Sequence, residues 1–212
     1  MKLLAVCVGQ PKEVTYRDKT VMTGIFKEPV EGRVMLRQTN LDGDRQADLR
    51  YHGGGDKAVY AYPFEHYAYW QEKLGRSDFK YGQFGENLTT EGLLEEEVRI
   101  GEVLGIGGAL LQVTQPRTPC FKLGLKMGQD TFPPLFLESG RSGFYLRVLR
   151  EGEIGAGDPI EIVERPTDCL TVRELWHLMH YETENREGAK IALAMPALSQ
   201  AWRETLEERV RK

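Results

Sequence analysis

The sequence predicts a mainly β chain with some α-helix, in which a strand-rich region is followed by a small domain of three helices. Short apolar runs separated by turn residues continue to about residue 165, and apolar residues then recur at helical spacing. The change of pattern falls between residues 165 and 170. We therefore expect a strand-rich domain over residues 1–166 and a three-helix domain over residues 167–212.

Seven segments of the first region are expected to form strands, because each is apolar, short and bounded by glycine or polar turn residues. Many short strands of this kind are typical of a barrel or a sandwich. The segments are KLLAVCVG (2–9), RVMLRQT (33–39), KAVYAY (57–62), EVRIGEVLGIG (97–107), ALLQVTQ (109–115), GFYLRVL (143–149) and PIEIVER (159–165).

One helix is expected to interrupt the strands at PFEHYAYWQEKL (63–74). Pro63 suits the first turn of a helix, and Tyr67, Trp70 and Leu74 recur at helical spacing. We interpret these apolar side chains as part of the core rather than of a functional site.

The three C-terminal helices follow from capping and periodicity. Thr171 and Glu174 form a capping box at the start of TVRELWHLMHYE, a second helix covers REGAKIALAM (186–195), and a third follows Pro196. Their apolar stripes must pack on the strand domain or across a dimer, and we favour a homodimer. The stripe residues are Val172, Leu175, Trp176 and Met179 in the first helix and Leu198, Trp202, Leu206 and Val210 in the third.

Composition excludes several classes of protein. The 28 Lys and Arg against 32 Asp and Glu give a net charge of -4, which does not favour binding to nucleic acid or to a membrane. The first apolar run breaks at Gln10 and Pro11, so we interpret it as a strand rather than a signal peptide. The three cysteines favour neither a disulfide framework nor a zinc or iron–sulfur site, and we expect a cytoplasmic protein.

Glycine-rich polar clusters stand outside the periodic pattern. In YHGGGDKAVY (51–60), the glycines and Lys57 either wrap an anionic ligand or form a tight turn between strands. In NLDGDRQAD (40–48), the three aspartates lack the spacing of a calcium loop, so we expect a solvated loop. The other clusters are FGENLTTEG (84–92), QPRTPCFKLG (115–124) and GRSGFYLR (140–147).

Cys120 is the strongest candidate for chemistry. As a free cysteine it could be a small buried hydrophobe, but Pro119 favours an extended chain that leaves the preceding strand and presents Cys120 in a loop. Arg117 and Lys122 would favour its thiolate, the form that attacks electrophiles and binds metals. His52, which precedes the glycines, is the best acid–base candidate among the histidines.

Taken together, five clusters in one order resemble the MOSC-domain proteins of the YiiM-like branch, over nearly the whole chain. They are GIFKEPVEGRV, LDGDRQAD, HGGGDKAVYAYP, FGENLTTEGL and TQPRTPCFKLG. The resemblance implies a MOSC β-barrel followed by the three-helix domain, and a protein that binds the molybdenum cofactor in its molybdopterin form. It further implies that Cys120 is the molybdenum ligand.

The resemblance also implies which residues surround the cofactor, since a polar pterin with a phosphate tail needs backbone amides and cations. We expect catalytic roles for Cys120, His52 and Lys122, the last two as proton donors. The expected cofactor-binding residues are Arg45, Gly53, Gly54, Lys57, Gly85, Glu86, Asn87, Gln115, Arg117, Thr118 and Arg141.

The activity implied by the resemblance is reduction of N-hydroxylated bases, such as 6-hydroxylaminopurine, to amines as a detoxification. The sequence carries no flavin or nicotinamide fingerprint, so electrons would come from a separate reductase. The alternative is a carrier of sulfur or of the cofactor that uses Cys120 without turnover of its own. A chain of 212 residues has no room for the pyridoxal-phosphate domain that cofactor sulfurases need.

Overall fold

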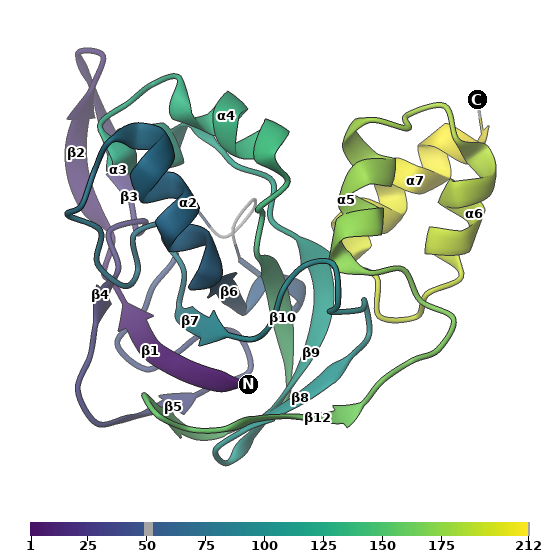
Figure 1. Ribbon diagram of the computed structural model, residues 1–212, viewed down its shortest axis with the longest axis horizontal. Helices are drawn as coiled ribbons and strands as arrows, with labels where there is room; N and C mark the ends of the chain where they lie inside the picture. Colours follow the sequence, from purple (N-terminus) through teal and green to yellow (C-terminus); the bar gives the residue numbers. More distant parts are fainter. Residues whose placement is uncertain (49–52, 212) are drawn as a thin grey trace.

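A computed structural model describes residues 1–48 and 53–211, and Figure 1 shows a strand-rich body beside a separate group of three helices. Twelve strands are present in this described part of the chain. They are β1 (Lys2–Val8), β2 (Lys12–Tyr16), β3 (Lys19–Thr23), β4 (Glu28–Pro29), β5 (Arg33–Leu36), β6 (Val59–Pro63), β7 (Leu88–Glu91), β8 (Val103–Ile106), β9 (Ala109–Pro116), β10 (Phe144–Arg150), β11 (Gly152–Gly155) and β12 (Ile160–Glu164).

Eight of these strands form one mixed sheet in the order β12-β8-β9-β10-β6-β7-β1-β4. Its neighbours are antiparallel except β6 and β7, which run parallel. Strands β5 and β11 form a separate pair, and β2 and β3 form a hairpin that projects from the body (Figure 1). Inward-facing Leu3, Val59, Leu111 and Leu146 are fully buried, as expected for strands packed on a core.

The sheet is not closed as a barrel, so the expectation of a β-barrel is wrong on this point. The chain before β12 does return to β1, where Leu3 N donates to Asp158 O (3.0 Å) and Ile160 N donates to Met1 O (3.1 Å). A continuous ladder does not form there, because the chain turns at Gly157 (φ 95°) and Pro159 has no backbone N–H to donate. Within the described residues, this seam holds a single bridge, Lys2 to Pro159.

Three helices pack against the sheet in the first domain: α2 (Glu65–Leu74), α3 (Phe121–Met127) and α4 (Phe132–Ser139). The predicted helix at 63–74 is confirmed as α2, and its Tyr67 and Trp70 are buried as expected. Helices α3 and α4 were not predicted, since both are short and α4 opens with two prolines. They form an aromatic core with α2, in which Trp70 stacks on Phe136 with ring centroids 5.8 Å apart.

The three predicted C-terminal helices are confirmed as α5 (Val172–His180), α6 (Arg186–Leu193) and α7 (Gln200–Arg211). The capping box is present, since Thr171 Oγ1 accepts from Glu174 N and the Glu174 carboxylate accepts from Thr171 N. Buried side chains of the three helices join the same core cluster as the sheet. The apolar stripes are therefore covered within one chain and no longer argue for a dimer interface. The homodimer stays a prediction.

A short 3-10 helix, η1 (Gly55–Lys57), precedes β6 and lies within the glycine-rich HGGGDK motif. Its N-cap, Gly54, has φ 92°, a conformation that glycine adopts far more readily than other residues. No helix among residues 1–48 and 53–211 is long and apolar enough to span a membrane.

Candidate functional site: a cationic cavity at Cys120

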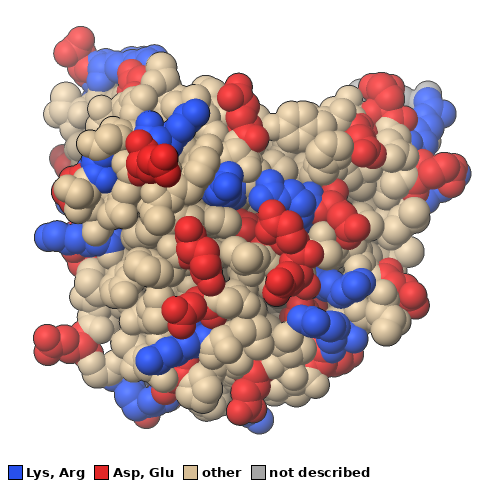
Figure 2. Space-filling view, viewed as in Figure 1, with Lys and Arg blue, Asp and Glu red and all other residues tan. Residues whose placement is uncertain are grey.

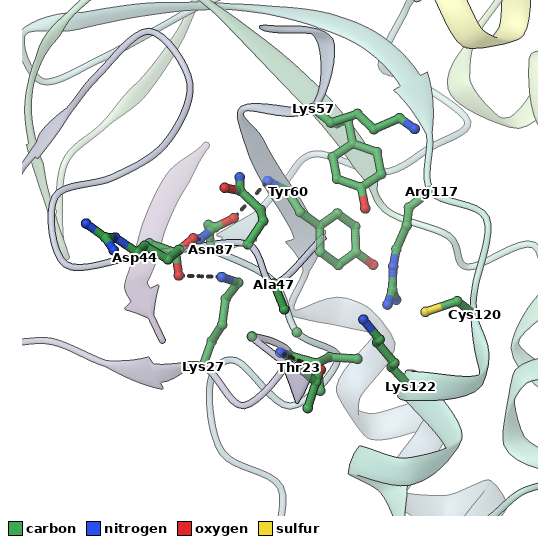
Figure 3. A pocket seen from close by; sticks show the side chains of 16 residues that line it. Thr23, Lys27, Asp44, Ala47, Lys57, Tyr60, Asn87, Arg117, Cys120 and Lys122 are labelled. Atoms are coloured by element: carbon green, nitrogen blue, oxygen red, sulfur yellow. Dashed lines mark hydrogen bonds and ion pairs between the residues drawn. The ribbon is translucent and has the colours of Figure 1, made fainter. Parts of the chain in front are cut away.

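A cavity opens where β6, β9 and β10 meet the start of α3. Its volume is about 590 Å³, including the open solvent at its mouth. Segments far apart in the sequence converge on it (Figure 3). It carries five basic side chains and one acidic one, so it favours an anionic ligand. The lining residues are Thr23, Gly24, Ile25, Lys27, Asp44, Arg45, Gln46, Ala47, Lys57, Tyr60, Gly85, Asn87, Arg117, Cys120, Lys122 and Tyr145.

Cys120 lies on this cavity, immediately before α3. Strand β9 ends at Pro116, and residues 117–120 have no regular structure, which confirms the expected loop. The backbone of Cys120 is extended (φ -123°, ψ 169°) and its side chain is half-buried. Figure 3 shows the sulfur turned toward the guanidinium of Arg117, with the ammonium of Lys122 reaching the same space.

Arg117 is the most deeply buried cation of the cavity, with 5% of the residue exposed. Its guanidinium lies over the rings of Tyr60, at 4.8 Å, and Phe136, at 5.6 Å. Arginine keeps its charge in proteins, and a buried charge costs free energy unless it is compensated. Atom Nη1 has no hydrogen-bond partner in the described part of the chain, so the guanidinium retains capacity to bind an anion.

Lys57 and Lys122 line the cavity from opposite sides, on η1 and on α3. Burial lowers the pKa of Lys57 below its ordinary value, while the neighbouring carboxylate of Asp56 opposes that shift. A lysine with a lowered pKa gives up its proton more readily near neutral pH than an exposed lysine does. Lys57 therefore adds a basic side chain with a lowered pKa to the cavity.

A buried polar network forms the floor of the cavity. Lys27 Nζ donates to Asp44 Oδ1 at 2.5 Å, and the two side chains are 9% and 1% exposed. Asp44 also accepts from Asn87 Nδ2 (3.0 Å) and Gly9 N (2.8 Å). Asn87 in turn accepts from Tyr60 N, which fixes the loop against β6. The solvated loop expected at 40–48 is therefore wrong for Asp44, because its carboxylate is enclosed by these donors.

Glu86, unlike Gly85 and Asn87 of the same FGEN motif, does not line the cavity. Its fully buried carboxylate accepts from Gly82 N and Phe84 N, both at 2.9 Å, and from the hydroxyls of Tyr67 and Thr89. These bonds hold the turn that brings Gly85 and Asn87 to the cavity. Gly85 has φ 81°, and a Cβ there would lie 2.7 Å from Ile25, so glycine is needed.

The structure brings together seven of the expected site residues on the cavity: Arg45, Lys57, Gly85, Asn87, Arg117, Cys120 and Lys122. Gln115 and Thr118 line an adjoining groove. Gly53, Gly54, Glu86 and Arg141 line neither of the two, and the Arg141 guanidinium lies over the Tyr69 ring at 3.7 Å. His52 lies outside the described residues. The roles of all these residues stay predictions.

Sequence reasoning missed Lys27, Asp44, Tyr60 and Tyr145 as site residues. Tyr60 and Tyr145 are paired across β6 and β10, with ring centroids 5.4 Å apart, and the sequence pattern predicts both only as strand residues. All four lie within clusters that the sequence analysis singled out, GIFKEPVEGRV, LDGDRQAD, HGGGDKAVYAYP and GRSGFYLR, but nothing in those clusters distinguishes them from their neighbours. Within residues 1–48 and 53–211, no three His, Cys, Asp or Glu side chains gather as a metal-binding group.

The fold and the cavity define a two-part protein, in which a MOSC-type sheet domain carries the cysteine and a three-helix domain follows. The MOSC domain family matches residues 48–161, and the YiiM-like 3-alpha helix domain matches residues 170–212. The chain belongs to the MOSC-domain family, in its YiiM-like branch. The MOSC family is associated with the molybdenum cofactor, which gives the chain a molybdenum-cofactor-associated function.

Known proteins similar to this chain support the same assignment. YflK of Bacillus subtilis is 41% identical over 95% of this chain and 90% of its own length. The crystal structure of YiiM from Geobacillus stearothermophilus matches with a TM-score of 0.84 and 39% identity, covering 99% of this chain and 98% of that one. A protein of Gibberella moniliformis named Reductase is 36% identical over 77% of this chain, a match that covers 29% of that protein.

Proposed function

We propose that the protein is a molybdenum-cofactor-dependent reductase of N-hydroxylated bases and related compounds, acting in detoxification, with Cys120 as the molybdenum ligand. The observation that carries the proposal is the half-buried thiol of Cys120 on a cavity lined by five basic side chains. A thiolate is a soft ligand suited to such a metal centre, and cations suit the anionic parts of the cofactor.

The residues present fit molybdopterin. Arg117 has an unpartnered buried Nη1 within the described residues, Lys57 and Lys122 line the same cavity as the thiol, and Arg45 is exposed at the cavity. A phosphate tail and the dithiolene sulfurs are both negatively charged, so each would meet a cation. Cys120 would hold the metal, which supplies two electrons and accepts oxygen when the cofactor is bound.

The chain's own residues would bind the ligands and supply protons. Conversion of an N-hydroxyl group to an amine breaks the N–O bond, consumes two electrons and two protons, and releases water. Lys122 and Lys57 line the same cavity as Cys120 and could donate those protons, and the lowered pKa of Lys57 favours donation. His52 stays a predicted donor.

We further propose that electrons come from a separate reductase. Support comes from the Gibberella moniliformis protein named Reductase, in which the segment similar to this chain occupies 29% of the length. The remaining length of that protein would allow an electron-donating region to be joined to the MOSC-type segment. For the present protein, we propose that a separate protein takes the place of that electron-donating region.

The test compares the wild-type chain with Cys120→Ser and with Cys169→Ser as the matched control, since Cys169 is also half-buried but does not line the cavity. All three are purified from a host that makes the cofactor. Bound molybdenum is measured by mass spectrometry, and reduction of 6-hydroxylaminopurine is measured with reduced methyl viologen as donor. We expect Cys120→Ser to lose both metal and turnover, and Cys169→Ser to keep both.

Two outcomes contradict the proposal. Equal molybdenum in wild type and Cys120→Ser would reject the ligand assignment. Bound cofactor without reduction of any N-hydroxylated compound would reject the reductase and favour the carrier of sulfur or cofactor.

A further inference from the structure

A second hollow adjoins the cavity and reaches the three-helix domain. This interdomain groove encloses about 1350 Å³ including open solvent, and it shares Lys57, Cys120, Lys122 and Tyr145 with the cavity. Its far wall consists of Ala201, Trp202 and Thr205 of α7. A ligand in the groove would therefore lie beside Cys120 and contact both domains.

The strands make the two hollows continuous. Tyr145 of β10 is in register with Tyr60 of β6 on one side and with Gln115 of β9 on the other. Directly paired residues project from the same face of a sheet, so the three side chains form one row. Tyr60 lines the cavity, Gln115 lines the groove, and Tyr145 lines both.

The groove offers flat apolar surface and one buried polar atom. Phe121, next to Cys120, is 48% exposed, and Trp202 of α7, which is 6% exposed, lines the same groove. Gln115 is 3% exposed, and its Nε2 donates to Pro116 O at 3.1 Å, which fixes the orientation of the amide. Its Oε1 has no hydrogen-bond partner in the described residues, and a buried acceptor without a donor costs free energy. Aromatic side chains beside a buried, unpartnered acceptor suit a flat heteroaromatic ring that carries an N–H group.

Helix α7 is held firmly enough to serve as a wall. Asp56 Oδ2 accepts from Gln200 N, at the start of α7, at 2.8 Å. Asp56 Oδ1 accepts from Arg147 Nη2 at 2.5 Å and from Arg147 Nε at 3.1 Å. Because Asp56 precedes Lys57 in η1, the same residue ties α7 to the loop that lines both hollows.

We propose that α7 forms one wall of the substrate subsite, so that the groove receives the flat ring of the substrate while the cavity holds the cofactor. This inference rests on the proposed function. The three-helix domain then selects substrates by size and shape, and Cys120 stands at the boundary between the two ligands.

The test fills the groove without touching the cavity. Ala201 and Thr205 are exposed and line only the groove, so A201L/T205L adds bulk there and leaves the core intact. The control is Glu207→Leu, on another face of α7 and outside the lining of the groove. Thermal unfolding verifies that both variants fold.

The first readout compares two substrates of the molybdenum-loaded protein. For A201L/T205L we expect the KM for 6-hydroxylaminopurine to rise about tenfold or more, because added methyl groups exclude a ring from a fitted pocket. The KM for N-hydroxyurea, which has no ring, and the molybdenum content should match those of Glu207→Leu. Equal effects on the two substrates, or no effect on either, would overturn the proposal.

The second readout does not depend on activity. Calorimetry measures the binding of adenine, the expected product, to the cofactor-free chain. We expect wild type and Glu207→Leu to bind it and A201L/T205L to bind about tenfold more weakly. Adenine that does not bind wild type, or binds all three equally, would overturn the inference. If the loaded protein reduces no substrate while adenine binding follows the expected order, the proposed activity fails and the ring subsite stands.

Discussion

At the scale of single residues, the three cysteines have unlike surroundings despite their identical chemistry. Cys7 is fully buried in β1, and burial raises the pKa of its thiol far above the ordinary range. Cys169 is half-buried at the start of the helical domain, where burial also raises its pKa. Cys120 instead lies beside Arg117 and Lys122 on an open cavity. Position, rather than residue type, marks it for chemistry.

This difference predicts selective alkylation of the native, cofactor-free chain. Iodoacetamide reacts with thiolates, so the raised pKa values of Cys7 and Cys169 slow their reaction, and burial shields Cys7 further. We expect Cys120 to be labelled first, with Cys7 labelled only after unfolding. Peptide mass spectrometry over a time course measures the order. Labelling of Cys7 before Cys120 would contradict this account.

The buried pair at the floor of the cavity predicts a large loss of stability. Lys27→Met leaves the 1% exposed carboxylate of Asp44 without its cation, although Gly9 N and Asn87 Nδ2 still donate to it. We expect the free energy of unfolding to fall by about 3 kcal/mol, as for other broken buried pairs. Urea unfolding measures the change. The double variant Lys27→Met/Asp44→Asn should recover part of it, and no recovery would argue against the pair.

At the scale of elements, the ends of α3, α5 and α7 are fixed by specific contacts or backbone conformations, which helix propensity alone does not specify. Helix α5 has the expected capping box, whereas α7 begins at a carboxylate supplied by Asp56 of another domain. Helix α3 begins directly after Cys120 and ends at Gly128, with φ 68°. These ends decide which side chains reach the cavity and the groove.

The packing of His180 predicts a pH dependence of stability. Its ring lies 4.1 Å from that of Trp176, and burial, followed by the charge of Arg209, lowers its pKa below 6.5. The unfolded chain therefore binds a proton first as pH falls below about 6.5, and stability decreases until the folded-state pKa is passed. We expect His180→Phe to reduce this slope between about pH 7 and 5.

Urea unfolding at several pH values measures that slope. His177→Gln is the matched control, since His177 is exposed on the same helix. An unchanged slope in His180→Phe would reject the assignment to His180.

At the scale of the whole molecule, charge is distributed without a dominant sign. Figure 2 shows acidic and basic side chains interspersed over the face in view. The cavity, in contrast, has an excess of cations, which suits a small anionic ligand. The two domains share one core and are also joined by Asp56, so the site belongs to the molecule rather than to either domain.

The hydrogen bonds of Asp56, which connect the sheet domain to α7, predict how Asp56→Ala changes stability. This change removes the acceptor of both Gln200 N and Arg147, and we expect a loss of about 1–3 kcal/mol of unfolding free energy. Asp42→Ala is the control, because Asp42 pairs with Arg37 at the surface and both are about half exposed. Hydrogen exchange should increase first in α7. If Asp56→Ala lowers the free energy of unfolding no more than Asp42→Ala does, the contacts of Asp56 contribute little to stability.

Much of the fold could be predicted from periodicity. Seven strands, α2 and the three C-terminal helices were predicted, because their apolar residues recur at the spacing that burial of one face demands. Helices α3 and α4 and strands β2, β3, β4, β7 and β11 were not predicted, because each is short. The two helices owe their burial to long-range contacts such as Trp70 with Phe132. The closed barrel was wrong because Pro159 and the turn at Gly157 interrupt the ladder at the seam.

The sequence by itself determined the class of protein, the order of the domains and the prominence of Cys120, since these depend on local pattern and on motifs in one order. Only the tertiary structure decided that Lys27, Asp44, Tyr60 and Tyr145 meet around that cysteine and that α7 adjoins it. The physical reason is that convergence depends on strand register and on long-range bonds such as Asp56 to Gln200. Neither leaves a signature in neighbouring residues.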